Sequence, residues 1–304
     1  MSQAQYAGPL HRWPGEISRF FWLHLLARRR FARGAGAART AGDNAGAAGG
    51  ELTLSLTTLP SRLPWIFPTL NSLLDQTQAP RRIVLAIPRR AERDPRPYRV
   101  PEGLRRHPRI ELLEADRDWG PATKLLPLLQ RLPADSQAPI VIVDDDNVYP
   151  RGFVATLAAA ARAWPDAALG LRGWPVPTSG RWADSREFFG TRIGAPVATD
   201  VLTGCGGVLV RPAFFDAAVF DYADAPVGAR FADDLWFSGH LARRGVRRLV
   251  VPTTERYVYL PTLATWRGVG LDRSENRDGG NNDRLLAHFA RDWDRGAVVG
   301  GVHA

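Results

Sequence analysis

From residue 52 onward, apolar and polar residues alternate in short blocks that predict a series of strands and helices. Leu52–Thr57 alternates with the period of a strand, and Ile140–Val143 is a run of branched apolar residues typical of a strand buried on both faces. Helical spacing of apolar residues predicts helices over 62–74, 153–164 and 231–244. Further strands are predicted at 82–87, 110–114, 168–171, 208–210 and 249–251. The order of these elements predicts an α/β sheet with right-handed crossovers.

Two segments lack periodicity. Arg89–Pro108 is rich in Pro and Arg and is predicted to be a surface loop. Gly173–Thr199 is also predicted to be a loop, and a loop of this length in a compact domain is often functional and could cover a ligand. Its Trp174 and Trp182 could stack on a sugar ring, but packing within the loop is the favoured interpretation.

The first 50 residues differ from this core. Ile17–Arg33 has a cluster of apolar residues between Phe20 and Leu26, followed by three arginines. The apolar run is far shorter than the roughly 20 residues that cross a bilayer, and it lacks the cleavage site of a signal peptide. Two interpretations stay open: a basic helix that lies on an anionic membrane, or a helix that packs on its own domain. Residues 34–50, rich in Gly and Ala, are predicted to be a flexible linker.

Composition restricts the compartment and the partners. The 304-residue chain has one cysteine, Cys205, so an intramolecular disulfide is impossible and a reducing, cytoplasmic location is expected. The net charge of +9 favours anionic partners such as nucleotides or anionic lipid. Nucleic acid is not expected as a partner, because the arginines are scattered and no recognition motif stands out. Lys124 is the only lysine, which suggests that its compact ammonium group is needed there.

Three carboxylates, Asp144, Asp145 and Asp146, follow the buried strand at 140–143 without a spacer. Their mutual repulsion is offset when a divalent cation bridges them to a phosphate-bearing ligand. In an open parallel sheet, ligands bind beyond the carboxyl ends of the strands, where this triplet is expected to lie. The alternative is a solvated acidic turn.

The segment Asp118–Lys124 is a candidate site for anion binding, and it begins a helix predicted to run to about residue 132. The N–H groups of a helix start, with Lys124 beside them, form a plausible anion site. Asp118 either caps this helix or contacts the ligand, and both interpretations stay open.

The second half of the chain carries a Gly-rich turn at Thr203–Gly207 and an acidic pair at Asp233 and Asp234. The glycines permit close approach of a ligand, and Cys205 within the turn is interpreted as structural because no His lies nearby in the sequence. The acidic pair is at the start of the helix over 231–244, where the helix dipole is expected to lower a carboxylate's pKa and keep it ionised, as a general base requires. A helix-capping role is the alternative.

Together these motifs resemble GT-A-type glycosyltransferases, close to the family-2-like bacterial enzymes that act on surface polysaccharides. The segments TTLPSR, DWGPATK, IVIVDDDNVYP, TGCGGVLVRP and FADDLWFS carry the resemblance, in this order, over roughly two hundred residues. The resemblance implies an α/β fold: a single GT-A-type, Rossmann-like domain with a mostly parallel central sheet over residues 51–304. Residues 51–148 would be the nucleotide-sugar-binding half and 149–304 the acceptor half, preceded by the basic helix and linker of residues 1–50.

The resemblance also implies roles for the site residues. Asp144 and Asp146 match the DxD motif that binds Mn²⁺ or Mg²⁺, and Asp234 matches the base of an inverting hexosyl transfer, with Asp233 beside it. The donor, with a UDP-sugar as first expectation, would contact residues from loops at one edge of the sheet: Thr57, Thr58, Arg62, Asp118, Lys124, Asp144 and Asp145. The acceptor would be a glycan or a lipid-linked molecule at the inner face of the cell membrane, in polysaccharide synthesis. The family's C-terminal metal-binding histidine has no clear counterpart, because His288 lies in an ordinary amphipathic pattern.

Other functions remain to be distinguished. Val143–Val148 also resembles the nucleophile motif of haloacid dehalogenase-type phosphatases, with Asp144 as nucleophile, Asp146 as acid/base and the acidic pair at 233–234 as distal metal ligands. Those enzymes use a lysine downstream of the nucleophile, whereas Lys124 lies upstream. A module of the same fold that binds a nucleotide sugar without turnover is a second alternative. A nucleotidyltransferase is disfavoured, because no Gly-rich phosphate-binding signature follows the first strand.

Overall fold

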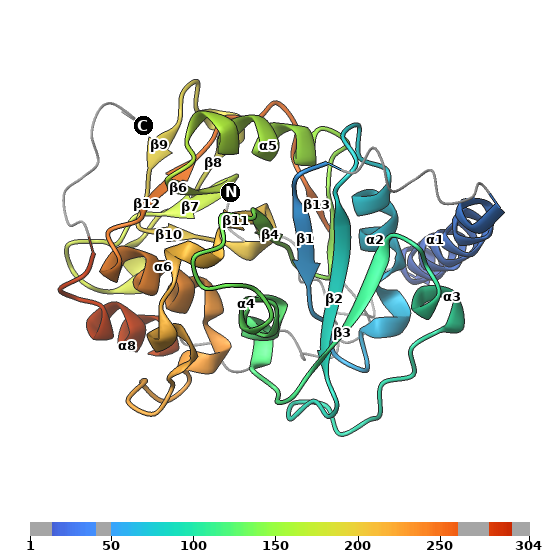
Figure 1. The fold of residues 1–304 in the computed structure, drawn as a ribbon, viewed down its shortest axis with the longest axis horizontal. Helices are drawn as coiled ribbons and strands as arrows, with labels where there is room; N and C mark the ends of the chain where they lie inside the picture. Colours follow the sequence, from blue (N-terminus) through green and yellow to red (C-terminus); the bar gives the residue numbers. More distant parts are fainter. Residues whose placement is uncertain (1–13, 41–49, 261–279, 294–304) are drawn as a thin grey trace.

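A computed structural model describes residues 14–40, 50–260 and 280–293 of the chain. Its centre is an eight-stranded sheet in the order β3-β2-β1-β4-β11-β6-β12-β9 (Figure 1). The strands are β1 Thr53–Leu56, β2 Arg82–Pro88, β3 Ile110–Ala115, β4 Ile140–Ile142, β6 Ala167–Gly170, β9 Val197–Ala198, β11 Val208–Val210 and β12 Arg247–Val250. Strands β3, β2, β1 and β4 are mutually parallel, as are β6 and β12, whereas β11 runs antiparallel between β4 and β6. The predicted α/β fold with a mostly parallel sheet is confirmed.

Helices cover both faces of this sheet, because its strands are apolar on both sides. In β4, Ile140 and Ile142 belong to one buried cluster, and Val141 belongs to the other. The first cluster is completed by α4 Leu126–Gln130, α6 Asp233–Arg243 and α8 Gly280–His288, and the second by α2 Phe67–Leu74 and α5 Phe153–Ala163. The result is a three-layer arrangement of helices, sheet and helices.

Two predicted helices are interrupted near prolines. The helix predicted over 62–74 is a 3-10 turn, η4 Leu63–Trp65, followed by α2, with Pro68 in the first turn of α2. The helix predicted from Asp118 to about residue 132 is a 3-10 turn, η5 Gly120–Lys124, followed by α4. Lys124 is therefore the last residue of a separate short turn.

Short elements occur where the sequence showed no period. The predicted loop over 173–199 contains parts of a small sheet made by β7 Arg172–Trp174, β8 Phe188–Phe189 and β10 Val201–Leu202, and also 3-10 turns η6 Trp182–Asp184 and η7 Gly190–Arg192. The predicted loop over 89–108 contains α3 Glu102–Arg105. A second small sheet pairs β5 Asn147–Val148 with β13 Val258–Tyr259. Elements of two to four residues are too short for a repeating pattern to reveal them.

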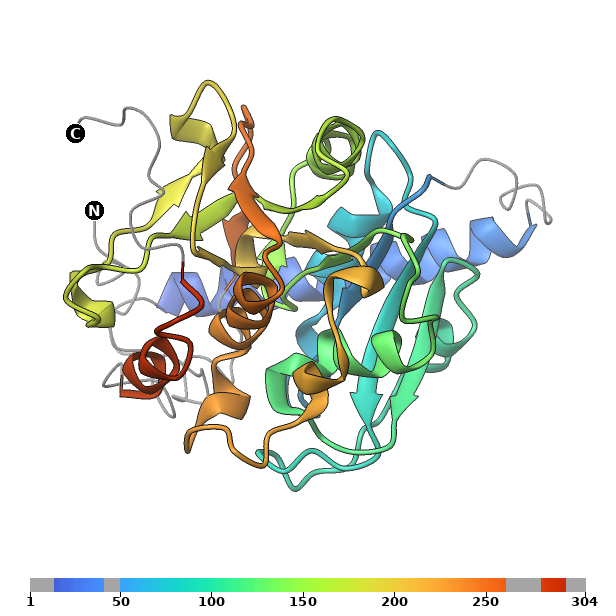
Figure 2. The ribbon, with the colours of Figure 1, turned by 60° about the vertical axis from the view of Figure 1, so that its left-hand side comes forward.

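The N-terminal helix α1 spans Pro14–Thr40 and contacts α2 and α3. It includes residues 34–40, which were assigned to a flexible linker; this segment contains several alanines, the best helix former, so the assignment is wrong there. Linker residues 41–49 lie outside the described residues. In the described parts of the chain, no helix is both long and apolar enough to cross a bilayer. Figure 2 shows α1 running along the outside of the sheet layer.

Candidate active site

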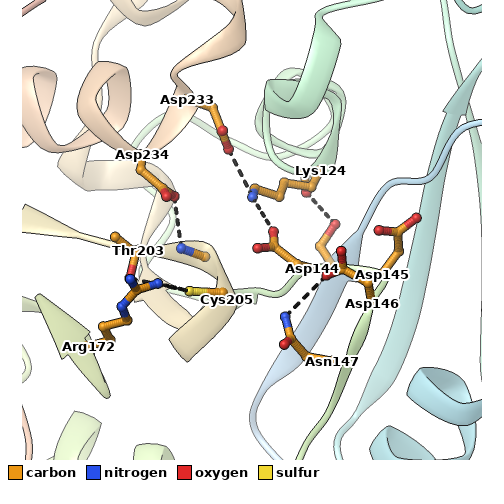
Figure 3. A network of polar contacts seen from close by, with 12 residues as sticks. Lys124, Asp144, Asp145, Asp146, Asn147, Arg172, Thr203, Cys205, Asp233 and Asp234 are labelled. Carbon is orange, nitrogen blue, oxygen red and sulfur yellow. Dashed lines mark hydrogen bonds and ion pairs between the residues drawn. The ribbon is translucent and has the colours of Figure 1, made fainter. Parts of the chain in front are cut away.

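Segments distant in sequence meet at one edge of the central sheet (Figure 3). Because β1 and β4 are neighbouring parallel strands, the loops that follow them leave the sheet at the same edge. The loop after β1 carries Thr58 and Arg62, and the loop after β4 carries the aspartates at 144–146. The end of η5 and the start of α6 bring Lys124 and a second group of aspartates to the same place.

Arg62 pairs with two of the three aspartates in the loop after β4. Its Nη2 lies 2.6 Å from Asp145 Oδ1 and 2.5 Å from Asp146 Oδ2. Thr58 Oγ1 donates a hydrogen bond of 2.5 Å to Asp145 Oδ2, so both oxygens of Asp145 are engaged. The Tyr98 hydroxyl donates to the Thr58 carbonyl at 2.7 Å and holds this loop in place. The structure therefore brings the predicted donor-side residues Thr58, Arg62 and Asp145 into contact.

Lys124 lies between the two groups of aspartates. Its Nζ is 2.7 Å from Asp144 Oδ1 and 2.9 Å from Asp233 Oδ2, and the residue is only 3 % exposed. Although burial opposes it, the charges of Asp144 and Asp233 raise the pKa of Lys124 well above its usual range. The Lys124 carbonyl accepts a 2.5 Å hydrogen bond from Ser55 Oγ of β1, which fixes the end of η5 against the sheet. A single buried cation thus connects carboxylates from the two halves of the chain.

The Gly-rich turn at Thr203–Gly207 lies against the same groups. The Gly204 N–H donates to Asp234 Oδ1 at 2.8 Å. A Cβ on Gly204 would lie 2.6 Å from Lys124 Nζ and 3.0 Å from Asp144 Oδ1, so a side chain does not fit there without displacing them. The close approach that the glycines predicted is therefore, in this structure, an approach to the protein's own charged groups.

The cluster carries more negative than positive charge. With every carboxylate ionised, five aspartates, Asp144, Asp145, Asp146, Asp233 and Asp234, would contribute −5, and Arg62 and Lys124 contribute +2, which gives a formal charge of −3. Burial raises the pKa of Asp146 to about 7 against the opposing charge of Arg62. Burial also raises the pKa of Asp145, again against the charge of Arg62.

The pKa of Asp234 is raised, whereas the sequence predicted a lowered one. Burial and the charge of Asp233 together raise its pKa to about 7, although the charge of Lys124 opposes the rise. The expectation that the helix dipole would lower this pKa is wrong, because the dipole acts as roughly half a charge while desolvation and neighbouring carboxylates act on the whole group. A carboxyl group with a pKa near neutrality can both accept and release a proton at physiological pH.

The carboxylates fit a hard divalent cation in their chemistry. The donors are oxygens, the cluster's formal charge with all carboxylates ionised is −3, and the buried Asn147 Oδ1 accepts no hydrogen bond from the described residues. In the described part of the chain, no three His, Cys, Asp or Glu side chains are arranged to hold a metal ion. Mg²⁺ is commonly held by one or two carboxylates together with substrate phosphates and water, and Asp144 and Asp146 can supply such a pair.

The remaining predicted site residues have more peripheral positions. Asp118 accepts hydrogen bonds of 2.7 Å from the backbone N–H groups of both Gly120 and Glu92, so it supports the loop before η5. Thr57 is half-buried directly after β1. Trp174 and Trp182 pack on each other with ring centroids 4.9 Å apart, in line with the packing interpretation.

Sequence reasoning did not identify the neighbours of Cys205. Arg172 Nη1 donates to Cys205 Sγ at 2.7 Å, and the Tyr257 hydroxyl donates to the same sulfur at 3.3 Å. Arg172 is also paired with Glu187, and burial raises the pKa of the Cys205 thiol. These contacts support a structural role for Cys205. No local pattern links residues that are 33 and 52 positions away from it, so the sequence held no signal for them.

No family model and no curated protein matches this chain. Among solved structures, S. aureus TarS 1–349 has a TM-score of 0.43 and 15% identity, covering 79% of this chain and 70% of that one. GalNAc-T7 with UDP, GalNAc and Mn²⁺ has a TM-score of 0.46 and 13% identity, covering 70% of this chain and 43% of that one. The mannosyltransferase PcManGT from Pyrobaculum calidifontis, in complex with GDP-Man and Mn²⁺, has a TM-score of 0.44 and 19% identity, covering 93% of this chain and 86% of that one.

The structure comparison thus returns glycosyltransferases, the class that the sequence resembles.

Replacing Lys124 with Met is expected to lower the free energy of unfolding by about 3–5 kcal/mol, because it leaves buried carboxylates without their cation. Denaturant unfolding measures this loss. The double variant Lys124→Met/Asp233→Asn should recover part of it, since one unpaired charge is removed. As a control, Arg106→Met breaks only the exposed ion pair with Glu102 and should change stability by less than about 1 kcal/mol. Strictly additive effects in the double variant would contradict the pairing.

The raised pKa of Asp234 predicts a pH-dependent stability. An acid whose pKa is higher in the folded than in the unfolded state makes the folded state bind more protons, so stability falls as pH rises. For Asp234 the fall should extend from its usual value of 3.8 to about 7. Thermal unfolding in chelator across about pH 4 to 8 should show this slope, and Asp234→Asn should reduce it. Asp135→Asn, at an exposed position outside the cluster, should retain the full slope; an unchanged slope in Asp234→Asn would contradict the assignment.

Proposed function

We propose that this protein is a metal-dependent glycosyltransferase that moves a hexosyl group from a nucleotide sugar to an acceptor hydroxyl with inversion. The observation that carries the proposal is the arrangement around Lys124. Asp144, which contacts Lys124, lies at the strand edge where a donor diphosphate would bind. Asp234, whose pKa is about 7, comes from the other half of the chain and follows Asp233, the second partner of Lys124.

The donor is proposed to bind at the edge formed by the loops after β1 and β4. Arg62 and Lys124 are the cations of this edge, and they would meet the negative charge of the diphosphate. Thr57, Thr58, Asp144 and Asp145 would contact the nucleoside and the sugar, and Asp118 would contribute through the loop that it supports. A UDP-sugar is the first donor to test.

Asp144 and Asp146 are proposed to hold Mg²⁺ or Mn²⁺ against the donor. When bound, the ion would stabilise the negative charge that develops on the leaving diphosphate. Arg62 contacts Asp146 and Lys124 contacts Asp144, so each of these carboxylates is kept close to a positive charge that limits its repulsion of the donor.

The proposed transfer is a single displacement. Asp234 takes the proton of the acceptor hydroxyl, the acceptor oxygen forms a bond to the anomeric carbon, and the bond from that carbon to the diphosphate breaks. A base with a pKa near the working pH suits this step, because it is partly ionised and still basic. Asp233 stays paired with Lys124 and holds the start of α6, so that Gly204 N–H can orient Asp234.

The acceptor is proposed to be a glycan or a lipid-linked molecule used in cell-surface polysaccharide synthesis. This part of the proposal derives from the resemblance of the sequence motifs. The enzyme would work in the cytoplasm, at the inner face of the membrane.

A phosphatase of the haloacid dehalogenase type is the second candidate, because Lys124 contacts Asp144, the residue that would be its nucleophile. That enzyme would release inorganic phosphate from a phosphate ester. A nucleotide-sugar transferase would release a nucleoside diphosphate from a nucleotide sugar, so the products separate the two activities.

A panel of nucleotide sugars should identify a donor from which the wild-type protein releases nucleoside diphosphate with Mn²⁺ or Mg²⁺ but not with EDTA. Asp146→Ala should lose metal-dependent donor binding in calorimetry, since it removes a proposed metal ligand. Asp135→Asn is the matched control and should bind donor normally. Binding without turnover for every donor would support a non-catalytic module, and phosphate release from simple esters would support the phosphatase.

Asp234→Asn is expected to lower kcat by about 10²-fold or more while donor binding is preserved, because it removes the general base and keeps the shape of the side chain. Steady-state kinetics and donor calorimetry measure the two quantities. The kcat of the wild type should rise with pH to a plateau, with an apparent pKa near the value of about 7 for Asp234. Retention of anomeric configuration in the product, or near-normal turnover by Asp234→Asn, would refute the proposed mechanism.

A further inference from the structure

Helix α1 is fixed to the domain by one of its faces. His24 and Phe31 are each 4% exposed. The Phe31 ring packs on Phe67 of α2 at a centroid distance of 5.1 Å, and Asn71 Nδ2 donates to the Ala27 carbonyl at 2.9 Å. These contacts recur every three or four residues, as expected for one side of a helix. The interpretation that this helix packs on its own domain is therefore correct for this face.

The other face of α1 is apolar and exposed. Trp22 is 58% exposed and Leu26 is 57% exposed. Phe21, Leu23 and Leu25 are also exposed, so α1 carries five of the eight exposed large apolar side chains of the described residues. Such a concentration on a single helix marks an interaction surface, since scattered apolar residues are the rule elsewhere on proteins.

Arginines continue this face toward the C-terminal end of the helix. Arg29 and Arg33 follow Trp22 and Leu26 at spacings of seven and eleven residues from Trp22, which places all four on one side of the helix. Arg28 and Arg30 are exposed nearby, and Arg30 also pairs with Asp75 at 2.5 Å. An apolar patch with aromatic residues is thus bordered by a group of positive charges.

A part of the domain itself extends the apolar surface. A groove of about 400 Å³ is lined by residues of both α1 and η4. The rings of Phe21 and His24 lie edge-on to Trp65 of η4, at 5.6 and 5.2 Å between centroids. The groove is lined by Phe21, Trp22, His24, Leu25, Arg28, Pro64 and Trp65. The surface therefore combines two elements with a fixed relative position.

We infer that α1 and η4 form a docking surface for an anionic lipid bilayer. The apolar residues around Trp22 and Leu26 enter the headgroup region, an acyl chain or glycerol backbone occupies the groove beside Trp65, and Arg29 and Arg33 contact anionic headgroups. The charge of the border argues for this occupant: arginines next to an aromatic patch match an anionic membrane, whereas a second copy of the chain would bring the same positive charges together.

The docking surface also has a defined relation to the candidate active site. Trp65 is three residues after Arg62, which pairs with Asp145 and Asp146. In Figure 1, α1 lies at the end of the molecule formed by β1 to β3, and α6 and α8 lie at the other end. This inference deepens the proposed function, because it names the membrane surface on which a lipid-linked acceptor would be reached, but its test requires no enzyme activity.

The test is flotation of the full chain with phosphatidylcholine vesicles, with and without phosphatidylglycerol. The wild type should float with the anionic vesicles, less at high salt, and weakly with neutral ones. Arg29→Gln/Arg33→Gln should weaken binding about thirtyfold, which corresponds to about 1 kcal/mol for each arginine. Trp22→Ala/Leu26→Ala should abolish flotation at every salt concentration. Since these side chains are exposed, circular dichroism and thermal unfolding should match those of the wild type.

The control Arg244→Gln/Arg291→Gln removes the same charge at the α6–α8 end and should float like the wild type. Equal loss in this control would show that net charge alone is responsible and would overturn the surface assignment. Normal flotation of Trp22→Ala/Leu26→Ala, or equal wild-type binding to neutral vesicles, would also overturn it. A dimer of the wild type that dissociates in Trp22→Ala/Leu26→Ala, seen by light scattering, would assign the face to self-association instead. Donor turnover is measured separately, without vesicles. A protein that turns over donor but does not float would contradict only the docking surface, and a protein that floats but does not turn over donor would contradict only the proposed function.

Discussion

The candidate active site depends on the two ion pairs that the buried ammonium group of Lys124 makes. This ammonium group contacts Asp144 after β4 and Asp233 at the start of α6, two residues from different halves of the chain. Carboxylates in a buried place repel each other and are poorly solvated, so without a cation the two segments would move apart or take up protons. Glycine is needed at position 204, because its backbone lies too close to the Lys124 ammonium group to leave room for a side chain.

The mixed topology of the sheet explains how these segments come together. Parallel pairing of β1 and β4 places the loops with Thr58 and the aspartate triplet at one edge. Strand β11 pairs with β4 in the antiparallel direction, so the Gly-rich turn that precedes β11 arrives at the same edge. Because β11 runs antiparallel to β4, the turn before it brings the Gly204 N–H close enough to donate a hydrogen bond to Asp234. The outcome is a site in which Asp144, Asp145 and Asp146 each contact Lys124 or Arg62, and in which burial raises the pKa of both Asp146 and Asp234 to about 7.

The segment from Arg62 to Trp65 connects two surfaces with different chemistry. Its first residue pairs with Asp145 and Asp146, and its last residue borders the groove beside α1. The short 3-10 turn η4 lies between these two contacts in the chain, and Pro64 favours this turn by its fixed backbone angle. The proposed donor site and the proposed bilayer-docking surface therefore share one short element of the domain.

The sequence by itself determined the main elements of the sheet and the acidic edge that follows β4. The branched run at Ile140–Val143 and the aspartates after it are local patterns, and they predicted a buried strand and a charged edge that the structure contains. The glycines at 204–207 predicted close approach of a ligand, and in the structure Gly204 lies close to Lys124 and Asp144 instead. Local patterns suffice for these features because a run of branched apolar residues and closely spaced glycines can be recognised from neighbouring positions alone. The interruption of the helices at η4 and η5 was visible only in part, through the prolines.

Only the tertiary structure decided how the charges are paired and which surfaces are covered. Lys124 was expected beside a ligand, but its carboxylate partners come from distant segments that no local pattern connects to it. The pKa of Asp234 was expected to fall at a helix start, and it rises, because desolvation and the neighbouring Asp233 outweigh the dipole. For α1, the sequence could not separate packing from exposure, and the structure has both, on opposite faces. Burial and long-range electrostatics depend on the position of every element around a group, and that information exists only in the folded chain.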